Sequence, residues 1–173
     1  MRLIVFHKNW QPGNCDTQVC LALYKLAAAN HDIRIITTSH NGVGTIEGGK
    51  GIVVERVEST PGRVDGVFIN NSLDCLRKRK ADVILNINNA AQIPFKLTIP
   101  IVTLWHNLTA CEFQDVFKYS KFYDEHIVCS SSDADILIKH ITPNTAVHRL
   151  DYISSDNIEP ILLNAMKLAR YKG

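Results

Sequence analysis

The sequence predicts an α/β protein with a single doubly wound, mainly parallel sheet of about seven strands and helices on both faces. Short, β-branched apolar runs, of the kind that is buried on both faces in a parallel sheet, recur along the chain. Stretches with apolar residues at helical spacing alternate with these runs, which is typical of βαβ units with right-handed crossovers. No internal repeat or low-complexity tract competes with this pattern.

The length and composition fit one globular domain over residues 1–173. The chain has 173 residues, of which 46% are hydrophobic and 21% charged. A domain of this size buries roughly 70% of the surface of its unfolded chain and needs no disulfide or metal to be stable. The formal net charge of +2 is too small to indicate a nucleic-acid partner.

Cysteine usage and hydropathy indicate a cytoplasmic protein. The five cysteines are odd in number and form no CxxC pair, which favours free thiols in a reducing compartment. The apolar run at Met1–His7 is too short for a signal peptide. No stretch approaches the ~20 apolar residues of a membrane-spanning helix.

The first part of the chain predicts a strand, a helix and a second strand. Arg2–His7 contains four consecutive apolar residues and is predicted to be a central strand. A polar, turn-rich loop follows, and Asn14 or Asp16 can cap a helix that runs through Ala29. The β-branched run Asp32–Thr38 is the second predicted strand.

The next stretch is predicted to be a loop, a strand and a helix. Ser39–Gly51 contains five glycines and no apolar period, which indicates a surface loop. Gly49 and Lys50 do not form a phosphate loop, because glycine rather than serine or threonine follows. Ile52–Val57 is the third predicted strand, and Asp65–Arg79 reads as an amphipathic helix.

A basic run, Arg77–Lys80, ends that helix. Cations at a helix C-terminus interact favourably with the helix dipole, so a solvated helix end is the preferred interpretation. A contact with an anionic membrane or with phosphate is the alternative.

Four further strands and four further helical segments complete the expected pattern. The strands are predicted at Asp82–Asn88, Ile99–Trp105, His126–Cys129 and Thr145–Leu150. The helical segments are predicted at Ala90–Leu97, Ala110–Phe122, Ala134–Ile141 and, capped by Ser155 or Asp156, Asn157–Tyr171.

The stretch Ile99–Asn107 is the main candidate for a site. Pro100 blocks a helix before it, and Ile101–Leu104 suits a strand buried on both faces. In an open α/β sheet, ligands bind beyond the carboxyl ends of the strands. His106 is therefore expected on the rim where recognition or chemistry takes place.

The order of these motifs resembles that of the N-terminal, acceptor-side Rossmann-like domain of GT-B glycosyltransferases, particularly the large retaining glycosyltransferase family 4. The matching runs, in order, are Gly13–Val19, Asn30–Ile36, Asp82–Ile84, Ile99–Asn107 and His126–Ser130. The resemblance covers about Met1 to Tyr152. Asn30 replaces a glycine usual in the family, and of the usual Gly-Gly pair only Gly13 is present.

The resemblance implies two functions between which the sequence does not decide. A donor-binding C-terminal domain has no room in 173 residues. The chain would then be the acceptor-side half of a GT-B enzyme, transferring sugar from a nucleotide sugar to a glycan acceptor with a second subunit that supplies the donor-binding domain. The alternative is a non-catalytic module derived from a GT-B domain that binds a sugar, a nucleotide or a protein. Whether the chain is an enzyme stays open.

The resemblance assigns the catalytic role to His106, because the histidine at the matching position in the family lies near the donor sugar and diphosphate. An imidazole there could bond a sugar hydroxyl or polarise the departing phosphate. A histidine that merely satisfies a backbone group at the end of the strand is the competing interpretation.

Further rim residues are candidates for substrate binding. Gly13 and Asn14 precede a helix N-terminus, which attracts anions. An aromatic ring such as that of Trp10 or Trp105 can stack on a sugar, and uncharged polar side chains can bond its hydroxyls. The predicted binding residues are Trp10, Gly13, Asn14, Asn88, Asn89, Asn107 and Ser130. The competing explanations are an ordinary strand–helix turn for Gly13 and Asn14, edge packing for the tryptophans, and an exposed polar loop for the asparagines.

The sequence predicts no metal and no cofactor. The histidines lack metal-ligand spacing, and there is no HExxH, no nucleophile elbow and no dinucleotide-binding glycine motif. A flavodoxin-like or receiver-like domain is a weaker third interpretation, because the residues after the first strand are His7, Lys8 and Asn9 rather than an acidic cluster.

Overall fold

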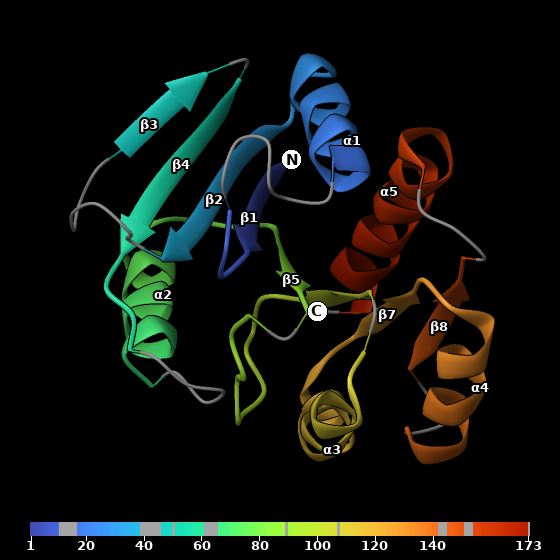
Figure 1. Ribbon diagram of the computed structural model, residues 1–173. Coiled ribbons are helices and arrows are strands. Elements are labelled where there is room, and N and C mark those ends of the chain that lie inside the picture. Colours follow the sequence, from blue (N-terminus) through green and yellow to red (C-terminus); the bar gives the residue numbers. More distant parts are fainter. Residues whose placement is uncertain are drawn as a thin grey trace.

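The computed structural model has three layers, a twisted sheet between two layers of helices (Figure 1). It describes residues 1–10, 17–38, 46–49, 51–60, 66–88, 90–106, 108–141, 145–150 and 154–172. Two helices cover one face, α1 (Thr17–Ala28) and α5 (Ser155–Lys172). The other face is covered by α2 (Gly66–Lys78), α3 (Ala110–Tyr119) and α4 (Ser131–His140), with a short 3-10 helix, η1 (Ser120–Phe122), after α3.

The sheet confirms the predicted fold class, with seven parallel strands and one antiparallel edge strand. The strands are β1 (Arg2–Phe6), β2 (Asp32–Thr38), β3 (Ile46–Gly49), β4 (Ile52–Val57), β5 (Val83–Ile87), β6 (Ile101–Trp105), β7 (Glu125–Val128) and β8 (Ala146–Arg149). Their order across the sheet is β3-β4-β2-β1-β5-β6-β7-β8, and only β3 is antiparallel to its neighbour.

Two expected elements differ from the structure. The glycine-rich stretch predicted as a loop contains β3, which pairs with β4 and covers its edge. Ala90–Leu97 is not helical. The amide of Asn86 donates to the Ala91 carbonyl at 2.9 Å and accepts from the Ala91 N–H at 3.1 Å. These bonds, and the missing N–H of Pro94, hold this segment away from a helical conformation.

The alternation of side chains along β1 divides the hydrophobic core into two parts. Leu3 and Val5 point into the layer under α1 and α5. Ile4 and Phe6 point to the opposite side, under α2, α3 and α4. All four are at most 3% exposed. Both faces of β1 are therefore buried, as expected for a central strand of a parallel sheet.

The N-terminal caps show why three helices begin where they do. Thr109 and Glu112 form a capping box at α3, and the Ser130 hydroxyl accepts the Asp133 N–H at α4. At α5 the cap is formed by Ser154 and Asn157, each side chain accepting the other's backbone N–H. The prediction that Ser155 or Asp156 caps this helix is therefore wrong, because this reciprocal pair lies one residue earlier.

The last helix packs back onto the same domain. The Lys25 ammonium of α1 lies 2.6 Å from the Asp156 carboxylate of α5. The backbone N–H of Ser155 donates to the Gln18 side chain at 2.8 Å. Ile158 and Leu162 of α5 are fully buried in the core under α1. These contacts join the two ends of the chain into one unit.

The cysteines differ in part from the prediction. Cys75 and Cys129 are free, as expected, but Cys20 on α1 is disulfide-bonded. The prediction of five free thiols is therefore wrong for Cys20, because cysteine spacing in the sequence does not determine which thiols pair. In the described part of the chain, no helix is both long and apolar enough to cross a membrane.

Asn30, which stands where the family that the sequence resembles usually has glycine, adopts a left-handed conformation with a φ of 62°. Asn is among the few non-glycine residues that tolerate this region. Asn30→Gly should leave the free energy of unfolding unchanged or raise it. Asn30→Val should lower it by about 1–2 kcal/mol, because a β-branched side chain is strained there. Urea unfolding of the variants measures both values.

A matched control uses the same substitution at an exposed position inside a helix. Asn70→Val on α2 should change the free energy of unfolding by no more than about 0.5 kcal/mol. Equal losses for Asn30→Val and Asn70→Val would contradict the explanation by backbone strain.

Candidate functional site

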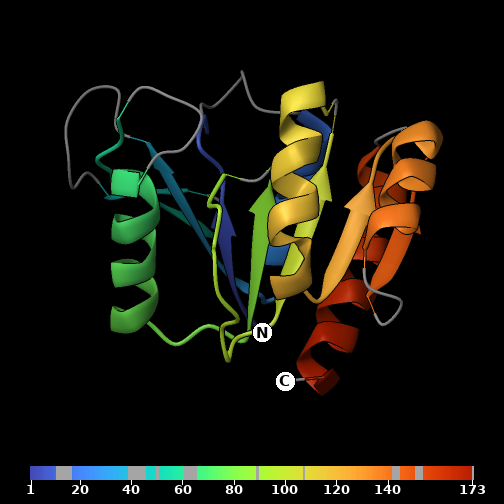
Figure 2. The ribbon, with the colours of Figure 1, turned by 90° about the horizontal axis from the view of Figure 1, so that it is seen from below.

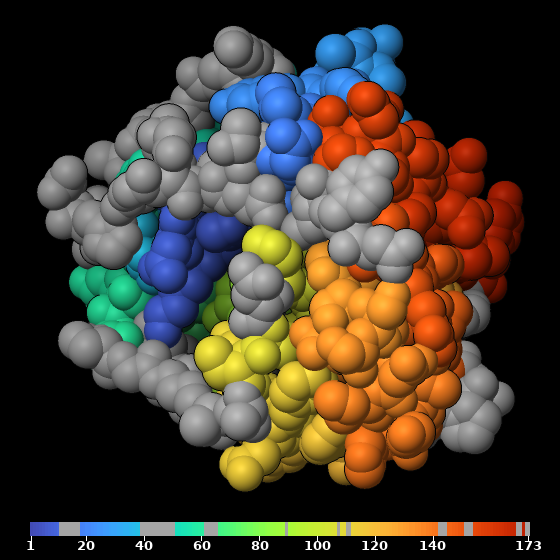
Figure 3. Space-filling model, turned by 45° about the vertical axis from the view of Figure 1, so that its right-hand side comes forward, coloured from blue at the N-terminus to red at the C-terminus, as the bar shows by residue number. Residues whose placement is uncertain are grey.

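The candidate site lies beside the carboxyl end of β1, where the strand order reverses. From β1 the chain moves to β2 on one side and later returns to β5 on the other side, so the strand order reverses between β1 and β5. Ligands of open α/β sheets bind at such a reversal. The residues that follow β1, β5 and β6 are His7, Asn88 and His106. Figure 3 shows atoms of the N-terminal segment, in blue, next to atoms of the green and yellow middle part of the chain on one face.

Asn88 and His106 are joined directly at this rim. The backbone N–H of His106 donates to the Asn88 side-chain oxygen at 2.7 Å. The backbone N–H of Asn88 donates to the Leu104 carbonyl at 2.8 Å. Asn88 has a φ of 47°, again in the left-handed region that Asn tolerates. The ends of β5 and β6 are thereby locked together, and the His106 side chain stays partly exposed.

The segment after β1 folds down onto the end of β2. The backbone N–H of Trp10 donates to the Thr37 hydroxyl at 2.9 Å, and the Thr38 hydroxyl donates to the Lys8 carbonyl at 2.7 Å. The Trp10 ring stands edge-on to His7, with ring centroids 5.6 Å apart. Trp10 is only 2% exposed and belongs to the core under α1 and α5. Its ring face is therefore occupied by the core and is not presented to a ligand in this structure.

Ser130 lies at the same edge, one strand beyond His106. The backbone N–H of Cys129, at the end of β7, donates to the Trp105 carbonyl at 3.0 Å, which aligns the two strand ends. The Ser130 hydroxyl accepts the Asp133 N–H at 3.3 Å and lies 2.9 Å from the Ser132 hydroxyl. Ser130 thus caps α4 and stands at the rim. The predicted site residues Gly13, Asn14, Asn89 and Asn107 lie outside the described residues.

A buried polar group supports β6 directly below the rim. The Trp105 indole N–H donates to Nδ1 of His126 at 2.9 Å, and the Thr103 hydroxyl lies 2.7 Å from the same nitrogen. An indole can only donate, so Nδ1 of His126 is an acceptor and the proton of the neutral ring is on Nε2. Burial lowers the pKa of His126 to about 4, which keeps the ring neutral at pH 7.

This arrangement predicts a pH-dependent stability. The unfolded chain takes up a proton on His126 near pH 6.5, whereas the folded chain resists protonation until about pH 4. Between these values the unfolded state binds more protons, so the free energy of unfolding falls as the pH falls. The slope from this residue is at most about 1.4 kcal/mol per pH unit.

His126→Asn supplies the comparison, because the amide oxygen can still accept the Trp105 N–H but does not titrate. Urea unfolding between pH 7 and pH 4 should show a smaller dependence on pH in the variant than in the wild type. All other histidines contribute equally to both proteins. Identical pH dependences would disprove the assignment to His126.

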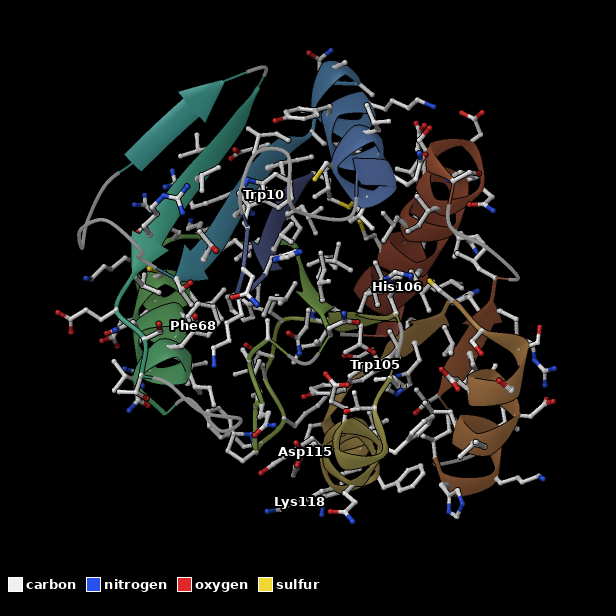
Figure 4. All side chains as sticks on the ribbon, viewed as in Figure 1. Trp10, Phe68, Trp105, His106, Asp115 and Lys118 are labelled. Atoms are coloured by element: carbon white, nitrogen blue, oxygen red, sulfur yellow. The ribbon has the colours of Figure 1, made fainter. Side chains whose placement is uncertain are left out.

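A second buried polar group, which sequence reasoning missed, holds the segment after β5. Asn86 on β5 bonds the backbone of Ala91, as described above. The Gln92 amide donates to the Asp115 carboxylate of α3 at 2.8 Å, and both side chains are less than 8% exposed. Figure 4 shows Asp115 on α3 and, on another element, the rim residue His106. The signal in the sequence was a polar residue, Asn86, inside an apolar strand.

The rim offers hydrogen-bonding side chains, including the imidazoles of His7 and His106. Among the residues that the structure describes, no three His, Cys, Asp or Glu side chains gather as a metal site would require. The partly exposed groups at the carboxyl edge include Asn88, His106 and Ser130. Uncharged donors and acceptors of this kind suit a polyhydroxyl or nucleotide ligand.

Asn88 gives a direct test of this geometry. Asn88→Gly retains access to positive φ but loses the acceptor for the His106 N–H, which should cost about 0.5–1.5 kcal/mol of stability. Asn88→Ala loses the acceptor and is also strained, so it should be less stable by about a further 1 kcal/mol. Urea unfolding gives the energies, and the amide chemical shift of His106 reports the lost bond. A glycine variant with an unchanged His106 amide shift would refute the role of this bond.

The fold is the Rossmann-like α/β fold that the resemblance to GT-B domains implies. Two solved chains of sucrose-phosphate synthase from Thermosynechococcus elongatus show it. The shorter is 14% identical, with a TM-score of 0.66 over 99% of this chain and 98% of that one. The longer is 11% identical, with a TM-score of 0.65 over 86% of this chain and 47% of that one, so this protein spans about half of its length.

Sequence comparison adds no closer relative. No family model matches the chain, and no similar curated protein was found. At identities of 14% and 11% the structural likeness shows the fold.

Proposed function

We propose that this protein is the acceptor-side half of a GT-B glycosyltransferase and acts with a separate donor-binding subunit in transfer from a nucleotide sugar. The similarity to a sucrose-phosphate synthase domain supports the class. The observation that carries the proposal is the bond from the His106 N–H to Asn88 at 2.7 Å, beside the reversal of strand order. This bond holds the backbone of His106 at the carboxyl edge, where ligands of open α/β sheets bind.

In this proposal His106 is the catalytic residue and the polar rim binds the substrate. The His106 imidazole bonds a sugar hydroxyl or the departing phosphate, which needs a donor or acceptor that is held in place beforehand. Asn88 and Ser130 bond further hydroxyls, and the N-terminus of α4 faces the same edge with its positive dipole end. Gly13, Asn14, Asn89 and Asn107 keep their proposed binding roles, whereas buried Trp10 would take part only after exposure.

The first experiment measures binding to the protein alone. UDP-glucose, GDP-mannose, the free nucleotides and oligosaccharides are tested by thermal unfolding, since a ligand that binds only the folded state raises the unfolding temperature. The proposal expects stabilisation by a nucleotide sugar and at least a tenfold weaker effect in His106→Ala. His140→Ala on α4, which removes an exposed histidine elsewhere, should bind as the wild type does.

The second experiment measures sugar transfer. The chain is purified from its own cells with any bound partner, and transfer from the stabilising nucleotide sugar to a glycan is followed by mass spectrometry. Transfer that needs the partner and is lost in His106→Ala supports the proposal. Absence of transfer, together with unchanged binding in His106→Ala, contradicts it.

A non-catalytic binding module is the second candidate. It is favoured by the neutral character of Asn88 and Ser130 at the rim, which suits recognition without group transfer. This candidate predicts stabilisation by a sugar, a nucleotide or a protein partner without turnover. A His106→Ala variant that loses binding although the wild type shows no transfer would select it.

A further inference from the structure

A polar pocket lies at the amino ends of β1 and β2, away from His106. It has a volume of about 320 Å³ and is lined by Arg2, Leu3, Ile4, Asp32, Arg34, Arg79 and Lys80. Arg2 and Asp32 begin β1 and β2 and are neighbours in register. Lys80 follows the C-terminal end of α2, which lies at the same end of the molecule as the N-terminus (Figure 2). Segments far apart in the sequence therefore bring four cations to one pocket.

Two of the guanidinium groups are fixed by a single carboxylate. One oxygen of Glu55 accepts from Arg34 at 3.0 Å and from Arg79 at 3.1 Å. The other oxygen accepts from the Cys75 thiol at 3.2 Å, and burial raises the pKa of that thiol to about 12, so it stays protonated. Burial alone would raise the pKa of Glu55, but the Cys75 bond and the arginines outweigh it and hold that pKa below its usual range.

The cations exceed the carboxylates that lie against them. Arg2 pairs with Asp82 at 2.6 Å, and Arg34 and Arg79 share Glu55. Asp32, which also lines the pocket, is a third carboxylate against four cations. Lys80 has no ion-pair partner among the described residues. Each guanidinium offers five N–H donors, of which these pairs use only some. The pocket thus keeps N–H groups and an unpaired ammonium for an anion.

We propose that this pocket binds a phosphate monoester. Three guanidinium groups and one ammonium, from β1, β2 and the end of α2, line the pocket. Together they offer more N–H donors than the two oxygens of a carboxylate can accept, which suits the several oxygens of a tetrahedral dianion. The volume lies near the lower end of the roughly 300–1,000 Å³ of small-molecule sites, so it has room for a phosphate with a small organic body. In this proposal Arg79 and Lys80, the last two residues of the basic run Arg77–Lys80, bind the ligand.

The experiment titrates the full chain, followed by amide and arginine side-chain NMR signals. The probes are inorganic phosphate, glycerol 3-phosphate, and phosphatidylcholine vesicles with and without phosphatidic acid. The proposal expects saturable shifts at Arg2–Ile4, Arg34 and Arg79 with glycerol 3-phosphate. Binding only to the vesicles with phosphatidic acid would identify a lipid headgroup as the source of the phosphate. An absence of shifts at these residues with every probe would overturn the proposal.

A matched pair of variants separates a pocket from general attraction. Lys80→Glu should weaken binding at least tenfold, whereas Lys78→Glu, with the same charge change two residues away, should change it less than twofold. Equal effects of the two variants would overturn the proposal. Arg34→Lys provides a second test. It keeps a cation beside Glu55 but loses the planar, two-pronged set of guanidinium N–H donors, so it should also weaken phosphate binding. His106→Ala should leave this binding unchanged, so its outcome is independent of the proposed function.

Discussion

The burial of β1 on both faces is the constraint on which the structure depends. Leu3 and Val5 need a cover on one side, and Ile4 and Phe6 need one on the other. A strand with two apolar faces requires helices on both sides of the sheet. Helices α1 and α5 cover the face with Leu3 and Val5, and α2, α3 and α4 cover the other face, so a single domain meets this requirement. Loss of either layer would expose half of the core.

This central strand also determines where ligands can bind. With β2 on one side of β1 and β5 on the other, the strand order reverses at the middle of the sheet. His106 lies at the carboxyl edge near that reversal, whereas the basic pocket around Arg34 uses the region near the amino edge. The two regions therefore have different chemistry, because asparagine, serine and histidine side chains lie at the carboxyl edge whereas three arginines and a lysine line the pocket. Each can be altered without touching the other.

Below the carboxyl edge, buried polar side chains replace part of the apolar core. Asn86, Thr103 and His126 are neighbours in register on three adjacent strands and are fully buried. Their bonds leave few alternatives for the backbone above them, because an unpaired polar group in the core is costly. The stiffness of the rim thus comes from residues that a ligand never touches.

The sequence by itself determined the fold class, most strand positions and the place of His106 and Ser130 at the ends of strands, because apolar periodicity and caps act locally. It did not determine that residues 46–49 pair as a strand, that Trp10 is buried, or that Asn86 keeps Ala90–Leu97 from becoming a helix. These features depend on partners distant in the chain. The joining of Arg2, Arg34 and Lys80 in one pocket was likewise decided by the tertiary structure, since strand order, not sequence order, makes them neighbours.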